Sequence, residues 1–191
     1  YTYVLGDMKL MSGVSIIGLI ASLVGIVMGP YLANRFGKKK VYLTAVIIST
    51  ALNLLRLLDV TSMILIYISA LIGGVAGGWM VPVSTSIQAD NTTYVQYKTG
   101  KRAEAAIASL TSFVSKVAQG LGGAIPGYVI AAYGFVTGAS VQPESINTGI
   151  ILCALILPLI FGILGSLIFG TQYTLDQKAV IEMDAKINRN N

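Results

Sequence analysis

The sequence has no histidine and only one cysteine, Cys153. The shortage of histidine and thiol ligands excludes the usual zinc patterns, and a single cysteine excludes an internal disulfide framework. Charged side chains are also scarce: they make up 11% of the chain, whereas a soluble domain carries roughly a quarter. Because hydrophobic residues make up 54% of the chain, we do not expect a soluble domain.

Long apolar runs take the place of those charges. A bilayer core about 30 Å thick requires roughly 20 apolar residues in a helix. The stretches that meet this requirement are 14–32, 41–58, 63–87, 105–133 and 147–169. The apolar and aromatic start, Tyr1–Leu5, is interpreted as the end of an earlier span, which indicates a piece of a longer protein. The sequence therefore predicts an all-α integral membrane protein with five full transmembrane helices and the end of a sixth.

Most of the basic residues gather in three polar segments, 33–40, 89–104 and 172–191. An even number of predicted spans separates each pair of these segments, so all three lie on the same side of the membrane. Positively charged loops face the cytoplasm, so we expect this side to be the cytoplasmic one. We expect a multi-pass protein of the cell inner (plasma) membrane with a helical bundle at 1–171. The segment 172–191 is then a cytoplasmic tail that forms a short amphipathic helix. This placement explains the net charge of +5 without a nucleic-acid partner.

Lys116 is the most unusual residue of the predicted spans. It lies about 11 residues, or roughly 17 Å, into the span 105–133, which places it near the bilayer centre. A charge at that depth costs at least about 2.5 kcal/mol, so the side chain should face the bundle interior or water. Ser112 and Gln119 recur with it at helical spacing and form one polar stripe. We interpret Lys116 as functional; the alternative is a structural lysine that is paired across helices.

Three further side chains in the spans are candidates for polar or stacking contacts. Asn53 either hydrogen-bonds a ligand or joins two helices, and Trp79 either stacks on a sugar ring or packs in the core. Arg56 shares a helix face with Asn53 but lies near the outer end, where we expect it to snorkel to the headgroups. No nucleophile–base pair, metal-ligand cluster or phosphate-binding glycine loop occurs, so neither an enzyme nor a bound cofactor is predicted.

Small residues recur at helical spacing in three of the spans. In the span 63–87 they form two overlapping Gly-x-x-x-Gly pairs, made by Gly73, Gly74, Gly77 and Gly78. Small residues allow membrane helices to approach closely. Static packing and helices that slide during a transport cycle both remain open.

The stretch 88–116 reads QADNTTYVQYKTGKRAEAAIASLTSFVSK. It resembles the cytoplasmic loop and following helix of the glycoside–pentoside–hexuronide:cation symporters, the melibiose-permease family. That family's pattern is roughly A-D-x-x-D-Y-x-E-x-K-T-G-x-R, followed by an apolar helix with a lysine. The segments 1–7 and 34–40 resemble the end of its seventh helix and its basic loop between helices eight and nine. Thr93 and Gln96 depart from the pattern, because they replace two loop carboxylates.

The resemblance implies the major-facilitator fold, of which this chain would be the C-terminal six-helix half. It further implies sugar symport by alternating access, coupled to Na⁺ or H⁺, with no metal site in this half. The implied partners are the N-terminal half, a sugar substrate and the lipid bilayer. By the resemblance, Lys116 pairs with carboxylates of the N-terminal half and couples sugar to cation. Arg35, Asp90 and Arg102 match the family's cytoplasmic gating charges.

Other functions remain open at this stage. One is a major-facilitator relative that moves a non-sugar solute, and another is a membrane structural fragment without transport. A sugar site requires several hydrogen-bonding groups near the membrane midplane. The candidates for substrate or coupling contacts are Lys116, Gln119, Ser112, Asn53 and Trp79.

Overall fold

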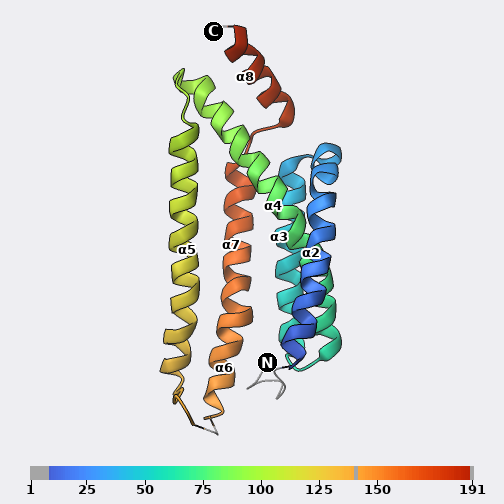
Figure 1. Cartoon of the computed structure of the whole chain (residues 1–191), viewed down its shortest axis with the longest axis vertical. Helices are drawn as coiled ribbons and strands as arrows, with labels where there is room; N and C mark the ends of the chain where they lie inside the picture. The colour runs from blue at the N-terminus through green and yellow to red at the C-terminus, as the bar shows by residue number, and fades with distance from the viewer. Residues whose placement is uncertain (1–8, 140–141, 190–191) are drawn as a thin grey trace.

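The computed structural model describes residues 9–139 and 142–189, and the regular structure in this part of the chain is entirely helical. Its elements are α2 (Lys9–Phe36), α3 (Lys38–Leu58), α4 (Met63–Thr99), α5 (Glu104–Ala132), α6 (Ser145–Ile151), η1 (Leu152–Ile156), α7 (Leu157–Gln172) and α8 (Gln177–Arg189). The π-helical turn η1 joins α6 to α7 in one continuous rod (Figure 1). The predicted earlier span, Tyr1–Leu5, lies outside the described residues.

Four of the predicted spans coincide with helices that are long and apolar enough to cross a membrane: Leu10–Phe36, Lys38–Leu58, Met63–Thr99 and Ser145–Gln172. The fifth predicted span forms a 29-residue helix, α5, at the expected place. Its serines, its glycines and Lys116 interrupt the apolar sequence of α5, which is not among these four helices. Its crossing of the bilayer therefore stays a prediction.

Helix α4 is longer than the sequence suggested. We expected its apolar span to end near Ile87 and a polar loop to follow, but the helix continues to Thr99. Gly100 ends it in the left-handed conformation (φ 68°), which glycine adopts at little cost, and donates its N–H to the Gln96 carbonyl. The polar extension is supported by α8, from which Lys186 Nζ lies 5.7 Å from the Tyr97 ring centroid. The predicted amphipathic tail helix is thus present as α8.

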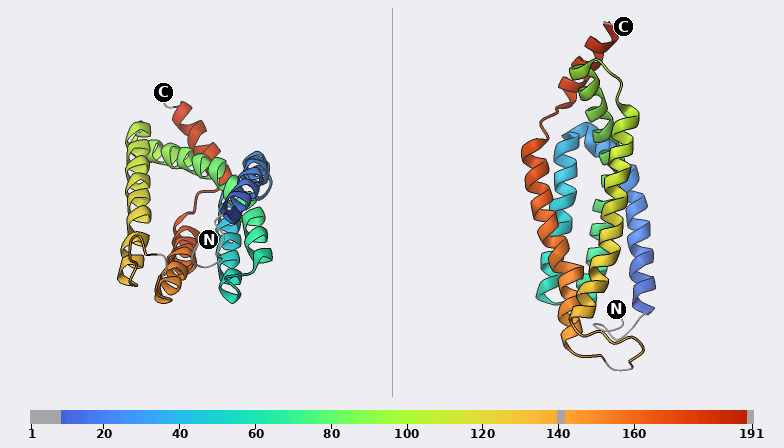
Figure 2. Two further views of the ribbon diagram at one scale, coloured as in Figure 1. Left: turned by 60° about the horizontal axis from the view of Figure 1, so that its bottom comes forward. Right: turned by 90° about the vertical axis from the view of Figure 1, so that its left-hand side faces the viewer.

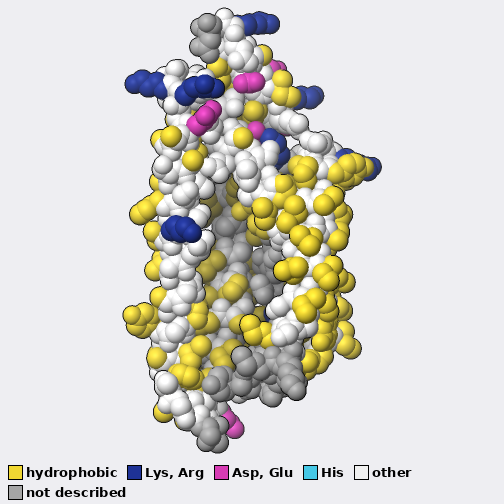
Figure 3. Space-filling model, in the orientation of Figure 1, with side chains coloured by type: hydrophobic (Ala, Val, Ile, Leu, Met, Phe, Trp, Pro, Cys, Tyr) yellow, Lys and Arg dark blue, Asp and Glu magenta, His cyan; other side chains and the backbone are white. Residues whose placement is uncertain are grey.

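The long helices run roughly alongside one another, and the views agree that α5 stands at the edge of the molecule (Figures 1 and 2). None of the described residues of α5 is buried. The space-filling view shows a hollowed face between α5 and the side formed by α2 and α4 (Figure 3). The polar stripe of α5 is therefore left uncovered within this chain.

Helices α2 and α4 pack at close range through small residues. A Cβ on Gly25 would clash with the Val75 carbonyl oxygen, and one on Gly78 would clash with the Ser22 carbonyl oxygen. Such close backbone contact replaces the hydrophobic driving force that is absent between helices in lipid. At these positions the small residues serve helix packing.

Replacing Gly78 with alanine is expected to destabilise the protein by about 1–3 kcal/mol, because overpacking forces the two backbones apart. Gly77 is the matched control, since a Cβ there would meet nothing within 4 Å. Gly77→Ala should be neutral or slightly stabilising, as expected for alanine in a helix. Thermal unfolding of both variants in detergent tests this difference, and equal losses would contradict it.

Candidate functional site

A polar triad joins three segments at the end of the bundle from which α8 leaves. Lys38 Nζ donates hydrogen bonds to both Asp90 carboxylate oxygens at 2.7 Å. The Tyr173 hydroxyl donates to Asp90 Oδ2 at 3.2 Å. Asp90 is only 6% exposed and Tyr173 8%. We call Lys38, Asp90 and Tyr173 the cytoplasmic triad, after the side on which we expect them to lie.

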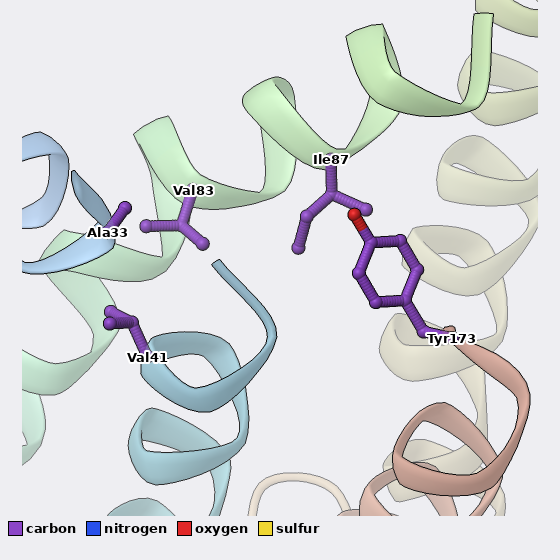
Figure 4. Close-up of a cluster of buried hydrophobic side chains, with 5 residues drawn as sticks. All are labelled: Ala33, Val41, Val83, Ile87 and Tyr173. Atoms are coloured by element: carbon purple, nitrogen blue, oxygen red, sulfur yellow. The ribbon is translucent and has the colours of Figure 1, made fainter. Parts of the chain in front are cut away.

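A buried apolar cluster positions the triad. Ala33, Val41, Val83, Ile87 and Tyr173 form this cluster, and Figure 4 shows them converging from α2, α3, α4 and the end of α7. The same helices carry the polar groups: one turn of α4 separates Ile87 from Asp90 on the same helix face.

The local chain geometry then sets the two partners of Asp90. Gly37, at φ 87°, connects α2 to α3 by a single residue and makes Lys38 the first residue of α3. Tyr173 follows α7 in extended backbone, and its ring stacks on Phe169 with centroids 4.9 Å apart. Apolar packing thus brings together polar groups that lie far apart in the sequence.

Burial of a carboxylate is unfavourable unless its charge and lone pairs are satisfied. Lys38 supplies the opposite charge and Tyr173 a further donor, so Asp90 meets this condition. Burial, together with the neighbouring Asp90 charge and hydrogen bond, raises the pKa of the Tyr173 hydroxyl well above its usual range. The hydroxyl therefore keeps its proton at physiological pH and remains a donor. The cytoplasmic triad ties α3, α4 and the end of α7 together.

The other two predicted gating charges do not join this triad. Arg35 is exposed, and its guanidinium lies 5.4 Å from the Phe36 ring centroid. Arg102 is exposed and lies 3.9 Å from Glu104. The structure therefore brings Asp90 together with Lys38, and not with Arg35 or Arg102. The sequence placed Lys38 only within the basic segment 33–40, and no signal in the sequence singled out Tyr173.

The polar stripe of α5 is placed where the sequence put it, on one exposed face of a long helix. Ser112, Lys116 and Gln119 are all exposed. In the described part of the chain, Lys116 makes no hydrogen bond or ion pair. If α5 crosses the bilayer, this ammonium group requires a partner from outside the described residues or access to water.

Asn53 and Trp79 lie apart from that stripe. Asn53 is half-buried and lines a cavity of about 210 Å³ between α2, α3 and α4. Trp79 is half-buried and packs against the apolar cluster, and its buried indole Nε1 has no hydrogen-bond partner among the described residues. Arg56 is half-buried and lines the same cavity as Asn53, and its extension to the headgroups stays a prediction.

A family model described as MFS/sugar transport protein matches residues 1–177 of the chain. The glucuronide carrier protein homolog of Escherichia coli K12 is 30% identical over 95% of the chain, and a putative sulfoquinovose importer of the same organism is 25% identical over 98%. The isoprimeverose transporter of Lactiplantibacillus pentosus is 28% identical over 69% of the chain. These matches span 41%, 40% and 28% of the relatives, so the chain covers about two fifths or less of their length.

Proposed function

Because the chain belongs to the MFS/sugar transport protein family, we propose that it is the C-terminal half of a sugar:cation symporter. The family and the relatives are transporters and not enzymes. The proposed protein is a secondary active transporter that works by alternating access, with Na⁺ or H⁺ as the coupling cation. The family description favours a sugar transporter over the non-sugar solute and the non-transporting fragment considered above.

The observation that carries the proposal is the uncovered polar face of α5. Its lysine lies midway along a helix of 29 residues, and none of the described residues of that helix is buried. In transporters built from two halves, substrate and coupling ions bind near the midplane, between the repeats. An N-terminal half that covers α5 would place Ser112, Lys116 and Gln119 at such a site. Sugar hydroxyls and a carboxylate of that half are suitable partners for these side chains.

The cytoplasmic triad is the second element of the proposed mechanism. Lys38, Asp90 and Tyr173 keep α3, α4 and the end of α7 together, so this end of the half moves as one body. Arg35 and Arg102 are exposed at the same end and accessible to carboxylates of the N-terminal half, although Arg102 also lies 3.9 Å from Glu104. We propose that such pairs close the cytoplasmic side in one state of the cycle and separate in the other.

The charge distribution supports a cytoplasmic location for this end of the bundle. Lys and Arg side chains gather at the end of the molecule that carries α8 (Figure 3). Because basic loops face the cytoplasm, the tail and α8 lie inside in the proposed topology, and the protein resides in the inner (plasma) membrane. The connection between α3 and α4, which contains Asp59, then faces the outside.

Uptake of radiolabelled sugars tests the proposed function. The transporter that contains this chain is reconstituted in vesicles and given a panel of glycosides, pentosides and hexuronides, with imposed Na⁺ or proton gradients. We expect gradient-driven accumulation of at least one sugar, lost when an ionophore collapses the gradient. The absence of accumulation of every sugar, with the protein confirmed in the membrane, would contradict the proposal.

A further inference from the structure

A second polar site lies in the half of the bundle opposite the cytoplasmic triad. The cavity of about 210 Å³ between α2, α3 and α4 is lined by the side chains Ser49, Asn53, Arg56 and Ser69, together with Val14, Leu52, Ile66, Ala70 and Gly73. Ser49, Asn53 and Arg56 follow one another at i, i+4 and i+7, so they share one face of α3. None of the lining residues comes from α5, so this cavity is separate from the Lys116 stripe.

The guanidinium of Arg56 carries a charge that the described residues do not neutralise. Arginine stays protonated in proteins, so the positive charge is permanent. Arg56 is half-buried, and its buried Nε has no hydrogen-bond partner among the described residues. Among the described residues, the cavity lining contains no carboxylate. A partly buried charge is stabilised by an opposite charge, so the Arg56 guanidinium is a suitable ligand for an anion that enters the cavity.

The acidic residue nearest in sequence is already engaged. Asp59 Oδ1 accepts hydrogen bonds from Thr61 Oγ1 at 2.8 Å, Thr61 N at 3.0 Å and Ser62 N at 3.0 Å. The bonds from Thr61 hold the pKa of the Asp59 carboxyl below its usual value, chiefly through the side-chain hydroxyl. Asp59 therefore caps the turn between α3 and α4, and it forms no ion pair with Arg56 in the structure.

We propose that this cavity binds an oxyanion group, a carboxylate or a sulfonate, with Arg56 as the charged ligand. The guanidinium presents N–H donors in the planar arrangement that matches two oxygens of such a group. The Asn53 amide and the Ser49 and Ser69 hydroxyls supply further donors along the wall. The cavity volume of about 210 Å³ is enough for an acid group with a few attached atoms.

This chemistry has two possible sources, an acid group on a transported sugar or a free inorganic oxyanion. The first rests on the proposed function and the second does not. In either case the binding site is the same, and its ligand sits in the outer half, one or more helical turns from the midplane. A sugar acid would therefore bind here before it reaches the α5 stripe. A free inorganic oxyanion would bind here independently of that stripe.

Thermal unfolding of the purified transporter in detergent tests the site without requiring transport. Glucuronate and glucose form a matched pair, because they differ only in the acid group. Sulfate is the inorganic probe, and choline chloride at equal ionic strength is its control. At ligand concentrations well above the dissociation constant, we expect an oxyanion to raise the Tm by about 2–4 °C. The shift should be lost in Arg56→Gln and partly kept in Arg56→Lys. Lys178→Gln, which removes an exposed charge on α8, is the control and should respond like the wild type.

The outcomes separate the two sources. A shift with glucuronate alone assigns the site to the sugar's acid group, and a shift with both glucuronate and sulfate assigns it to oxyanions in general. A shift with sulfate alone assigns it to a free inorganic anion. No shift in the wild type with either anion, or an unchanged shift in Arg56→Gln, would overturn the proposal. If Arg56→Gln fails to fold, the wild-type titration and the response of Arg56→Lys decide whether the cavity binds an oxyanion. A failure of sugar uptake would contradict the proposed function and would leave the thermal-shift result valid.

Discussion

Replacing Lys116 with alanine is expected to reduce gradient-driven sugar accumulation by roughly ten- to a hundred-fold, while membrane insertion is unchanged. The variant loses a positive charge that lies midway along α5, on a face that no described residue covers. One hydrogen bond to a charged group is worth about 1.5–3 kcal/mol, which corresponds to that range of rates. Because the side chain is exposed within this chain, its removal leaves no cavity in the packed helices.

The measurement is uptake in vesicles with an imposed cation gradient, together with sugar exchange in the absence of a gradient. A coupling role predicts a larger loss in the gradient-driven assay than in exchange. Lys178→Ala is the control, because it removes an exposed lysine from α8, outside the proposed site. Uptake at the wild-type level in Lys116→Ala would contradict the proposed role and would favour a structural lysine.

Replacing Asp90 with alanine is expected to lower the free energy of unfolding by about 3 kcal/mol. The change leaves the Lys38 ammonium without its partner in a half-buried position, and a buried pair that loses one member costs about 3–5 kcal/mol. The lower end applies here because the Lys38 side chain is 18% exposed. The Tyr173 hydroxyl also loses its acceptor.

A double-mutant cycle with Lys38→Met isolates the interaction. The double variant should be more stable than the sum of the two single changes predicts, since neither charge is then left unpaired. The exposed pair Arg102–Glu104, at 3.9 Å, is the internal comparison. Glu104→Ala is expected to change stability by no more than about 1 kcal/mol. Equal effects of Asp90→Ala and Glu104→Ala in thermal unfolding would refute the claim that the cytoplasmic triad is structurally important.

The sequence was sufficient for the architecture because the bilayer imposes a length on each apolar run. The all-α fold, the membership of a sugar transport family and the presence of four long apolar helices are confirmed. The position of Lys116 midway along α5 was readable from the sequence, since it follows from counting residues along one helix. The end of α4 was misjudged, because a polar segment reads as a loop although α8 supports it as a helix.

The partners of charged side chains could not be read from the sequence. Lys38 and Asp90 are 52 residues apart, and Tyr173 is 83 residues from Asp90. The resemblance implied Arg35, Asp90 and Arg102 as gating charges, and only the packing of α2, α3 and α4 shows that Asp90 pairs with Lys38. Arg56 likewise shares a cavity with Asn53 that only the packing of α2 and α4 against α3 reveals.

The sequence by itself thus determined which segments enter the membrane, since that depends on the local free energy of transferring apolar residues into lipid. It also predicted which side of the protein is cytoplasmic, and it placed a lysine midway along α5. Only the tertiary structure decided which polar groups meet. Those contacts depend on the rotation and spacing of whole helices, which close glycine contacts such as Gly78 against Ser22 set.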